Sequence, residues 1–220
     1  MTLKLGYGVA TLFFLAFFAV TLALQVSAKT YHRFLYWGVI LATTMVGTTI
    51  SDMVDRTLGL GYVRGALLLS ATLAATLGAW HLTTGSVAIA KMTTKKSEVF
   101  YWVTILISNT LGTALGDFLA DSAKLGYEGG ALVVSAALAL IGLAYFKSTV
   151  PRTALFWLAF VLTRPLGATV GDLLTKSHAK GGLDLGTAPS SLVVAAVLLV
   201  LVALSTKHSE QYALEARHRI

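Results

Sequence analysis

The sequence has no cysteine and few charged residues, and each shortage excludes a class of protein. Without cysteine the chain forms no disulfide framework, no thiolate metal site and no cysteine nucleophile. Charged residues make up 12 % of the 220 residues, whereas soluble globular proteins carry about a quarter. With 56 % hydrophobic residues and a mean hydropathy of +0.76, the chain cannot cover its surface with polar groups. These values exclude a soluble enzyme, a nucleic-acid-binding protein and a disordered chain as first interpretations, and they indicate an integral membrane protein.

Long apolar runs dominate the chain instead. A hydrocarbon layer about 30 Å thick needs about 20 apolar residues of helix. Seven runs reach that length, namely 5–27, 34–57, 62–88, 99–121, 127–147, 153–175 and 187–206. The sequence therefore predicts an all-α integral membrane protein with seven transmembrane helices. They form one transmembrane domain, 1–206, and a cytoplasmic tail, 207–220, follows it.

The basic residues outside the apolar runs predict the orientation. One set of loops, together with the C-terminal tail, carries ten lysine and arginine residues, and the opposite set carries six. Positive charge collects on the cytoplasmic side of membrane proteins. We therefore expect a multi-pass protein of the bacterial inner membrane, with its N-terminus outside and its C-terminus in the cytoplasm.

Self-comparison shows an internal repeat. Three segments align without gaps: YWGVILATTMVGTTISDM (36–53), YWVTILISNTLGTALGDF (101–118) and FWLAFVLTRPLGATVGDL (156–173). In each copy a tryptophan precedes an aspartate by fifteen positions. The pattern predicts parallel two-helix repeats at about 34–88, 99–147 and 153–206, preceded by one leading helix. Because each repeat has an even number of helices, all copies insert with the same orientation, around an axis along the membrane normal.

The repeated aspartates are the first candidate functional residues. A charged side chain inside a membrane is costly, so an intramembrane aspartate suggests a function. Hard divalent cations such as manganese, calcium and magnesium prefer carboxylate, hydroxyl and carbonyl oxygens. Candidate ligands for such a bound cation are the repeat-related Asp52, Asp117 and Asp172, with Asn109, Thr48, Thr113, Asp55 and Asp121 beside them. An alternative is that the aspartates only contact water at the outer helix ends.

Arg164 is the exceptional member of the next repeated position. It aligns with Thr44 and Asn109, eight residues before each aspartate. A buried arginine needs a partner, and the three aspartates are its natural candidates. Such a pair would equally serve as a structural link within the bundle. Pro165, which follows, is expected to kink its helix. The repeated glycines, Gly47, Gly112 and Gly167, are expected to allow close helix contact or to act as pliable points.

The repeated phrases also carry a resemblance. SNTLGTALGDFLAD (108–121) and LTRPLGATVGDLL (162–174) resemble a bacterial family of uncharacterised membrane-anchored proteins with repeated helices. The resemblance covers about residues 34–205, and it implies a multi-helix inner-membrane protein without supplying a reaction. The Gly-Asp ending is more loosely similar to the signature of small cation/proton exchangers. Those exchangers carry an acidic residue two positions before the Gly-Asp, where this chain has Thr49, Ala114 and Thr169.

These observations favour a membrane transporter. We expect a proton-coupled divalent-cation exchanger with Asp52, Asp117 and Asp172 as its central acidic site. Two alternatives stay open: a cation or proton channel lined by the same aspartates, and a structural or sensory membrane protein. No Gly-x-Ser-x-Gly elbow or His-Glu-x-x-His motif points to an enzyme. The expected partners are the lipid bilayer and a small ion or small molecule, with no nucleic acid and no covalent cofactor, and the odd number of repeats is consistent with a homodimer.

Overall fold

The computed structural model describes residues 2–28, 33–92 and 94–200, and all regular secondary structure in these ranges is helical. The long helices are α1 (Thr2–Ser27), α2 (Arg33–Asp52), α3 (Gly61–Thr84), α4 (Lys95–Asp117), α5 (Gly126–Lys147) and α6 (Arg152–Thr175). Six spans within the described residues are long and apolar enough to cross a membrane. By internal contacts the chain forms two compact units, residues 1–170 and 171–220, which are described separately.

The helices follow the predicted apolar runs within a few residues. Each of the first six runs corresponds to one of the six membrane-length spans. The seventh run is helical over Thr187–Val200, and its remainder, 201–206, lies outside the described residues, as does the predicted tail 207–220. Helix α4 begins at a capping box, in which Thr94 Oγ1 accepts a hydrogen bond from the Ser97 backbone N–H at 3.1 Å.

In two of the repeats, the first helix ends in the same unusual way. Helix α2 continues directly into a π-helical turn, η1 (Met53–Thr57), and α4 continues into η3 (Phe118–Ser122). Each turn follows the repeated aspartate. After each turn a glycine with φ near +70°, Gly61 or Gly126, starts the next helix. Wider turns of this kind are rare and often occur at functional sites. The first two copies of the sequence repeat therefore also share the same backbone structure.

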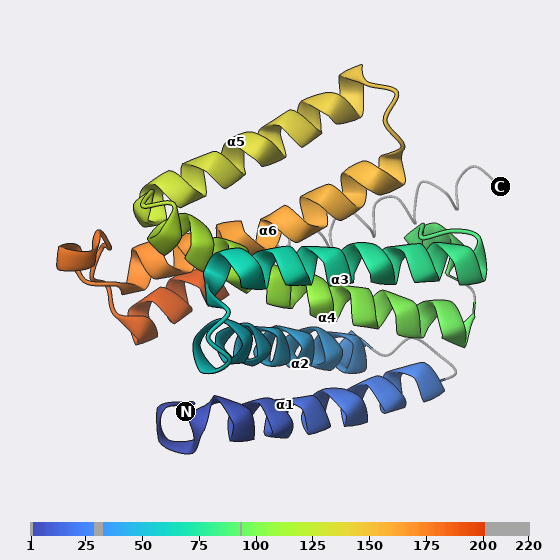
Figure 1. The fold of residues 1–220 in the computed structure, drawn as a ribbon, viewed down its shortest axis with the longest axis horizontal. Coiled ribbons are helices and arrows are strands. Elements are labelled where there is room, and N and C mark those ends of the chain that lie inside the picture. The colour runs from blue at the N-terminus through green and yellow to red at the C-terminus, as the bar shows by residue number, and fades with distance from the viewer. Residues whose placement is uncertain (1, 29–32, 93, 201–220) are drawn as a thin grey trace. The chain divides into compact units, whose positions relative to one another are not determined.

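The first helices of the first two repeats, α2 and α4, form the centre of the unit 1–170. Helix α2 packs against α4, while α1 packs against α2 and α3 packs against α4 (Figure 1). The contact of α1 with α2 therefore has the same form as that of α3 with α4. This arrangement agrees with the leading helix being the second half of an incomplete repeat. Helix α6 approaches α4 at Gly112 and Gly116, where glycine leaves room for Pro165 and Ala168.

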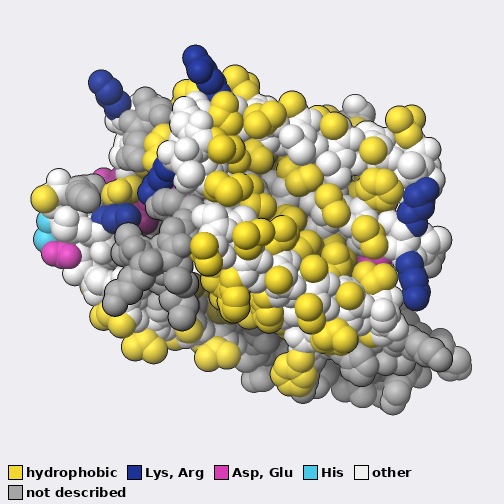
Figure 2. All heavy atoms as spheres, turned by 60° about the horizontal axis from the view of Figure 1, so that its bottom comes forward, with side chains coloured by type: hydrophobic (Ala, Val, Ile, Leu, Met, Phe, Trp, Pro, Cys, Tyr) yellow, Lys and Arg dark blue, Asp and Glu magenta, His cyan; other side chains and the backbone are white. Residues whose placement is uncertain are grey.

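A buried aromatic cluster closes one end of this unit. Trp80 and Trp102 are almost completely buried, and the ring of Trp80 meets that of Trp157 edge to face at 5.8 Å. Trp157 Nε1 donates a hydrogen bond to the Val87 carbonyl at 3.1 Å. Elsewhere large apolar side chains are exposed, as at Leu67, and the face drawn in Figure 2 is mainly apolar. Such a surface suits a lipid environment rather than water.

Candidate functional site

The three repeated glycines have different surroundings. A Cβ atom at Gly47 of α2 would lie 2.9 Å from the Thr110 backbone nitrogen and 3.0 Å from Asn109 Cβ in α4. A Cβ atom at Gly112 of α4 would overlap Arg164 Cβ in α6. Asn109 and Arg164 occupy the same repeat position, so one type of close contact recurs between successive repeats. The third glycine, Gly167, has no neighbouring atom within 4 Å of its would-be Cβ.

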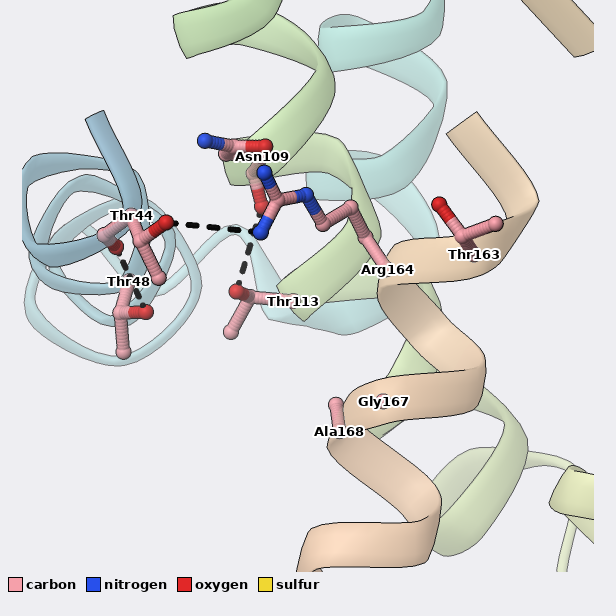
Figure 3. Close-up of a pocket in the computed structure, with 8 residues that line it drawn as sticks. All are labelled: Thr44, Thr48, Asn109, Thr113, Thr163, Arg164, Gly167 and Ala168. Atoms are coloured by element: carbon pink, nitrogen blue, oxygen red, sulfur yellow. Dashed lines mark hydrogen bonds between the residues drawn. The ribbon is translucent and has the colours of Figure 1, made fainter. Parts of the chain in front are cut away.

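A polar pocket lies beside Gly167, and we call it the central pocket. Its volume is about 260 Å³. It is lined by Thr44, Thr48, Asn109, Thr113, Thr163, Arg164, Gly167 and Ala168 (Figure 3). Six of these eight residues are two complete sets of repeat-equivalent positions. One set is Thr44, Asn109 and Arg164, and the other is Thr48, Thr113 and Ala168. The central pocket is therefore formed by the same positions of all three repeats.

The depth of the central pocket follows from where its residues lie along their helices. Thr44 lies close to the middle of the span Phe34–Thr57. Arg164 lies in the middle of Arg152–Thr175 in the same way. Helices of this length are matched to the thickness of a bilayer core. The pocket is thus near the midpoint of the membrane-length helices rather than at their ends.

Arg164 reaches across the central pocket from α6 towards α2 (Figure 3). Its Nη1 donates a hydrogen bond to Thr44 Oγ1 at 3.4 Å, and its guanidinium lies 5.9 Å from the centre of the Phe160 ring. Within the described part of the chain, no carboxylate oxygen lies within 4.0 Å of a nitrogen of Arg164. Instead of the aspartate partner considered for it, Arg164 has a threonine hydroxyl and an aromatic ring.

The other polar groups of the central pocket mainly offer hydrogen-bond acceptors. Thr48 donates its hydroxyl proton to the Thr44 carbonyl at 3.0 Å, and Thr163 donates to the Phe160 carbonyl at 2.7 Å. Thr113 donates to the Asn109 carbonyl in the same manner, at 3.3 Å. Since these protons are used within their own helices, the hydroxyl oxygens retain only acceptor capacity. The pocket therefore combines one cationic donor with several neutral acceptors.

Asn109 adds a further acceptor and is 4 % exposed. Its Nδ2 donates a hydrogen bond to Thr43 Oγ1 at 2.9 Å, which fixes the side chain between α4 and α2. Its Oδ1 has no hydrogen-bond partner within the described residues. A buried acceptor without a partner loses the hydrogen bonds that it makes in water and costs about 1–3 kcal/mol. The hydrogen bonding of Asn109 is thus incomplete.

Two of the repeated aspartates contact the same arginine, further along the helices from the central pocket. Arg56 Nε lies 3.3 Å from Asp52 Oδ1, and Arg56 Nη2 lies 3.7 Å from Asp117 Oδ2. Asp52 and Asp117 are partly buried. They follow Thr44 and Asn109 by eight residues, or about 12 Å of helix rise. The structure therefore brings together two of the three predicted aspartates, with a basic side chain between them.

The remaining acidic candidates have surroundings of their own. Asp172 belongs to the unit 171–220, where its Oδ1 lies 3.5 Å from Lys176 Nζ. Asp55 is buried, accepts a hydrogen bond from Ser51 Oγ at 3.4 Å and packs against Gly65 of α3. The side chain of Asp121 lies outside the described residues. In the described part of the chain, no group of three or more histidine, aspartate or glutamate residues is placed to hold a metal ion.

Sequence reasoning missed two features of these sites. Ala168 lines the central pocket, and its alignment with Thr48 and Thr113 was the available signal. Arg56 bridges two repeats. Its equivalent is Asp121 in the second repeat and Lys176 in the third, so a basic residue four positions after the repeated aspartate recurs in two copies and was the available signal. The predicted pliable residues have separate surroundings. Gly47 and Gly112 lie in tight helix contacts, Gly167 lines the pocket, and Pro165 is buried within α6.

The repeated architecture agrees with a comparison to known families. Three stretches of the chain, 35–86, 100–150 and 155–210, match the family described as Repeat of Unknown Function (DUF347). These stretches cover more than half of the sequence, so the chain belongs to this family. They also confirm the three repeats predicted from the sequence. The chain matches no curated protein and no solved structure.

Proposed function

We propose that this DUF347 repeat protein is a multi-pass protein of the bacterial inner membrane that carries a small solute through its central pocket. The six membrane-length spans support membrane insertion. The excess of basic residues on one set of loops favours an N-terminus outside and a C-terminus in the cytoplasm. The alternative of a purely structural membrane protein does not explain why a polar pocket lies in the middle of these spans.

One observation carries the proposal: equivalent positions of all three repeats line a polar pocket at the midpoint of membrane-length helices. Transporters built from repeats bind their substrates near the bilayer midplane, where the repeats meet. Polar and charged residues inside a membrane are costly, and they mark solute pathways. A pocket with a guanidinium, an amide and threonine hydroxyls at that depth has the expected composition of a solute site.

The glycine contacts indicate which helices would move. At Gly47 the backbone of α4 is too close to accept a methyl group, and at Gly112 the side chain of Arg164 is too close, so α2–α4 and α4–α6 meet closely at these two glycines. No such contact exists at Gly167, on the side of the pocket between α6 and α2. Alternating access therefore requires α6 to tilt against α2. Pro165 lacks a backbone N–H, which weakens the hydrogen-bond ladder of α6 beside the pocket.

The absence of cysteine allows a direct test of this transport path. A Gly167→Cys variant carries a single thiol in the pocket, and a side chain fits there without overlap. We expect a membrane-impermeant thiol reagent to label it both in right-side-out and in inside-out vesicles. The matched control is Leu67→Cys on the apolar surface of α3. A thiol facing lipid does not form the reactive thiolate, so this control stays unlabelled.

Each other outcome has a defined meaning. Labelling of Gly167→Cys from one side only contradicts a carrier, since the pocket must open to both sides in turn. Absence of labelling from both sides, in a protein that elutes as a folded species, contradicts the pocket as a solute site. A channel also gives labelling from both sides, but it adds a steady ionic current across a planar bilayer. Unlike a channel, a carrier shows no discrete single-channel conductance steps.

A second candidate function involves the group formed by Asp52, Arg56 and Asp117. Asp52 and Asp117 are repeat-related carboxylates that share one cationic group, Arg56. A divalent cation that displaced this guanidinium would meet two carboxylates, and protons would compete for the same oxygens. Manganese or calcium flux into proteoliposomes, with a pH dye in parallel, tests this exchange. We expect Asp117→Asn to lose the flux and Arg56→Gln to increase it, and absence of flux from the unmodified protein rejects the candidate.

A further inference from the structure

We infer that the solute of the central pocket is a small carboxylate that also carries a hydroxyl or ammonium group. This inference rests on the proposed function only in taking the pocket as the solute site. It follows from three properties of the pocket: an arginine with no carboxylate partner among the described residues, a set of acceptors, and a limited volume.

The arginine indicates the anionic end of the solute. Arg164 has five N–H donors in a planar fork, and Thr44 Oγ1 accepts from only one of its nitrogens, Nη1. No carboxylate of the described chain lies within ion-pair distance of it. A charge in the middle of a membrane-length helix is costly unless a counter-ion compensates it. A carboxylate matches the guanidinium fork with two parallel hydrogen bonds, which a halide ion cannot do.

The acceptors indicate a second group on the solute. The hydroxyl protons of Thr48, Thr113 and Thr163 are donated to carbonyls of their own helices. In this arrangement their oxygens are left to accept hydrogen bonds from a ligand. Asn109 lines the same pocket, but its carbonyl oxygen, which has no partner among the described residues, is itself buried, so the threonine oxygens are the acceptors that a ligand meets directly. A ligand that is only an anion leaves these acceptors unused, whereas an O–H or N–H group two or three bonds from the carboxylate supplies their donor.

The volume limits the size of the solute. A single water needs about 10–15 Å³ of cavity space, so a pocket of about 260 Å³ holds a molecule of several non-hydrogen atoms. A hydroxy acid or amino acid with a short side chain fits this space. Its apolar part would lie against Gly167 and Ala168, which are the pocket residues without polar side-chain atoms.

Three small probes of nearly equal size separate the two recognition elements. Glycolate carries both a carboxylate and a hydroxyl, acetate lacks the hydroxyl, and glycolamide keeps the hydroxyl but replaces the carboxylate with a neutral amide. Each is tested for its ability to slow the labelling of Gly167→Cys by the impermeant thiol reagent in purified, reconstituted protein. Gly167 is suited to this purpose because its substitution leaves Arg164, Asn109 and the threonines unchanged.

We expect glycolate to protect the thiol in a concentration-dependent manner. Acetate should protect more weakly, and glycolamide should need a concentration about tenfold to a hundredfold higher, because a charged hydrogen-bonded pair is lost. In the Gly167→Cys background, Arg164→Gln should lose protection by glycolate to the same degree. The matched control is Arg64→Gln, which removes an exposed arginine of α3 outside the pocket, and it should leave protection unchanged.

The comparison of probes does not depend on whether the Arg164→Gln variant folds. Equal protection by glycolate and glycolamide, or no protection by glycolate, overturns the inference about the solute. Equal protection by glycolate and acetate overturns the part that concerns the hydroxyl or ammonium group. These outcomes concern only the choice of solute and can be distinguished from the outcomes that reject the carrier proposal. Protection by glycolate of a thiol that is reachable from one side only would support the ligand class and reject transport.

Discussion

At the scale of single residues, equivalent positions of the repeat have acquired different roles. Thr44, Asn109 and Arg164 align in the sequence and line one pocket. The threonine accepts a hydrogen bond from the arginine, and the asparagine links α4 to Thr43. The position is therefore shared but the chemistry is not. A binding site that departs from the symmetry of its repeats can hold a solute in one orientation, which three identical side chains cannot do.

The repeated glycines provide a stability test with an internal control. Gly112→Ala places a methyl group where Arg164 Cβ lies. Overpacking of this kind costs about 1–3 kcal/mol. Gly167→Ala meets no atom within 4 Å, and replacing a helical glycine with alanine gains up to about 1 kcal/mol. We expect thermal unfolding in one detergent to show a lower midpoint for Gly112→Ala and an unchanged or higher midpoint for Gly167→Ala. Equal midpoints would contradict the tight contact of α4 with α6.

At the scale of elements, α4 is the helix most completely enclosed, and its start is well defined. More than half of its apolar window is buried, a larger share than for any other described span. Thr94 and Ser97 form reciprocal hydrogen bonds between side chain and backbone at its N-terminus. Because α4 contacts both α2 and α3, a change in how it begins affects the whole unit 1–170.

Removal of this cap is therefore expected to weaken the bundle. Thr94→Ala removes the acceptor for the Ser97 backbone N–H, and the loss of such a cap costs about 1 kcal/mol. The control is Thr72→Ala, whose exposed hydroxyl bonds only to the Leu68 carbonyl of its own helix. Chemical unfolding followed by circular dichroism should separate the two variants. A Thr72→Ala loss as large as that of Thr94→Ala would contradict the structural role of the cap.

The elements also show what the sequence was able to predict. Helix positions follow from the length of apolar runs, so the first six agree with the structure within a few residues. The π-helical turns after Asp52 and Asp117 had no such signal, since an apolar run looks the same whether its hydrogen bonds join residues four or five apart. The contact that accompanies the first turn, Asp55 against Gly65, depends on the packing of α3 and cannot be seen in a local pattern.

The sequence singled out several residues of the central pocket, but it centred the site on the repeated aspartates, none of which lines the pocket. Alignment of the repeats identified Thr44, Asn109, Arg164, Thr48 and Thr113, all of which line the central pocket. It gave no means of knowing that the guanidinium would reach a threonine and not an aspartate. Charge pairing depends on which faces of neighbouring helices meet, and helices that are apolar nearly all round carry little information about their facing. Arg56 shows the same limit, because its two partners come from different repeats.

At the scale of the whole molecule, the proposed orientation can be tested independently of transport. Ala123 lies in the connection before α5, and Thr149 lies in the connection before α6. Both are exposed. If the N-terminus is outside, Ala123→Cys faces the periplasm and Thr149→Cys faces the cytoplasm. We expect an impermeant thiol reagent to label Ala123→Cys in cells with a permeable outer membrane, and to label Thr149→Cys only after the inner membrane is opened. The reverse pattern would invert the proposed topology.

The two polar sites of the molecule have different roles in the proposed transport. The central pocket binds the solute, and the pair of Asp52 and Asp117 with Arg56 lies about 12 Å further along the helices. The tight contacts at Gly47 and Gly112 join the first helices of the repeats, while the side next to Gly167 stays open. In the proposed mechanism, the side held by the contacts at Gly47 and Gly112 stays fixed while the side next to Gly167 moves.

The measurement that tests this most directly is the uptake of radiolabelled glycolate into proteoliposomes that contain the purified protein. We expect saturable uptake above that of protein-free vesicles, competition by unlabelled glycolate but not by glycolamide, and loss of uptake in Arg164→Gln with full activity in Arg64→Gln. Uptake by Arg164→Gln equal to that of the unmodified protein would contradict the role of the central pocket. Absence of uptake by a protein whose Gly167→Cys thiol is protected by glycolate would contradict transport itself.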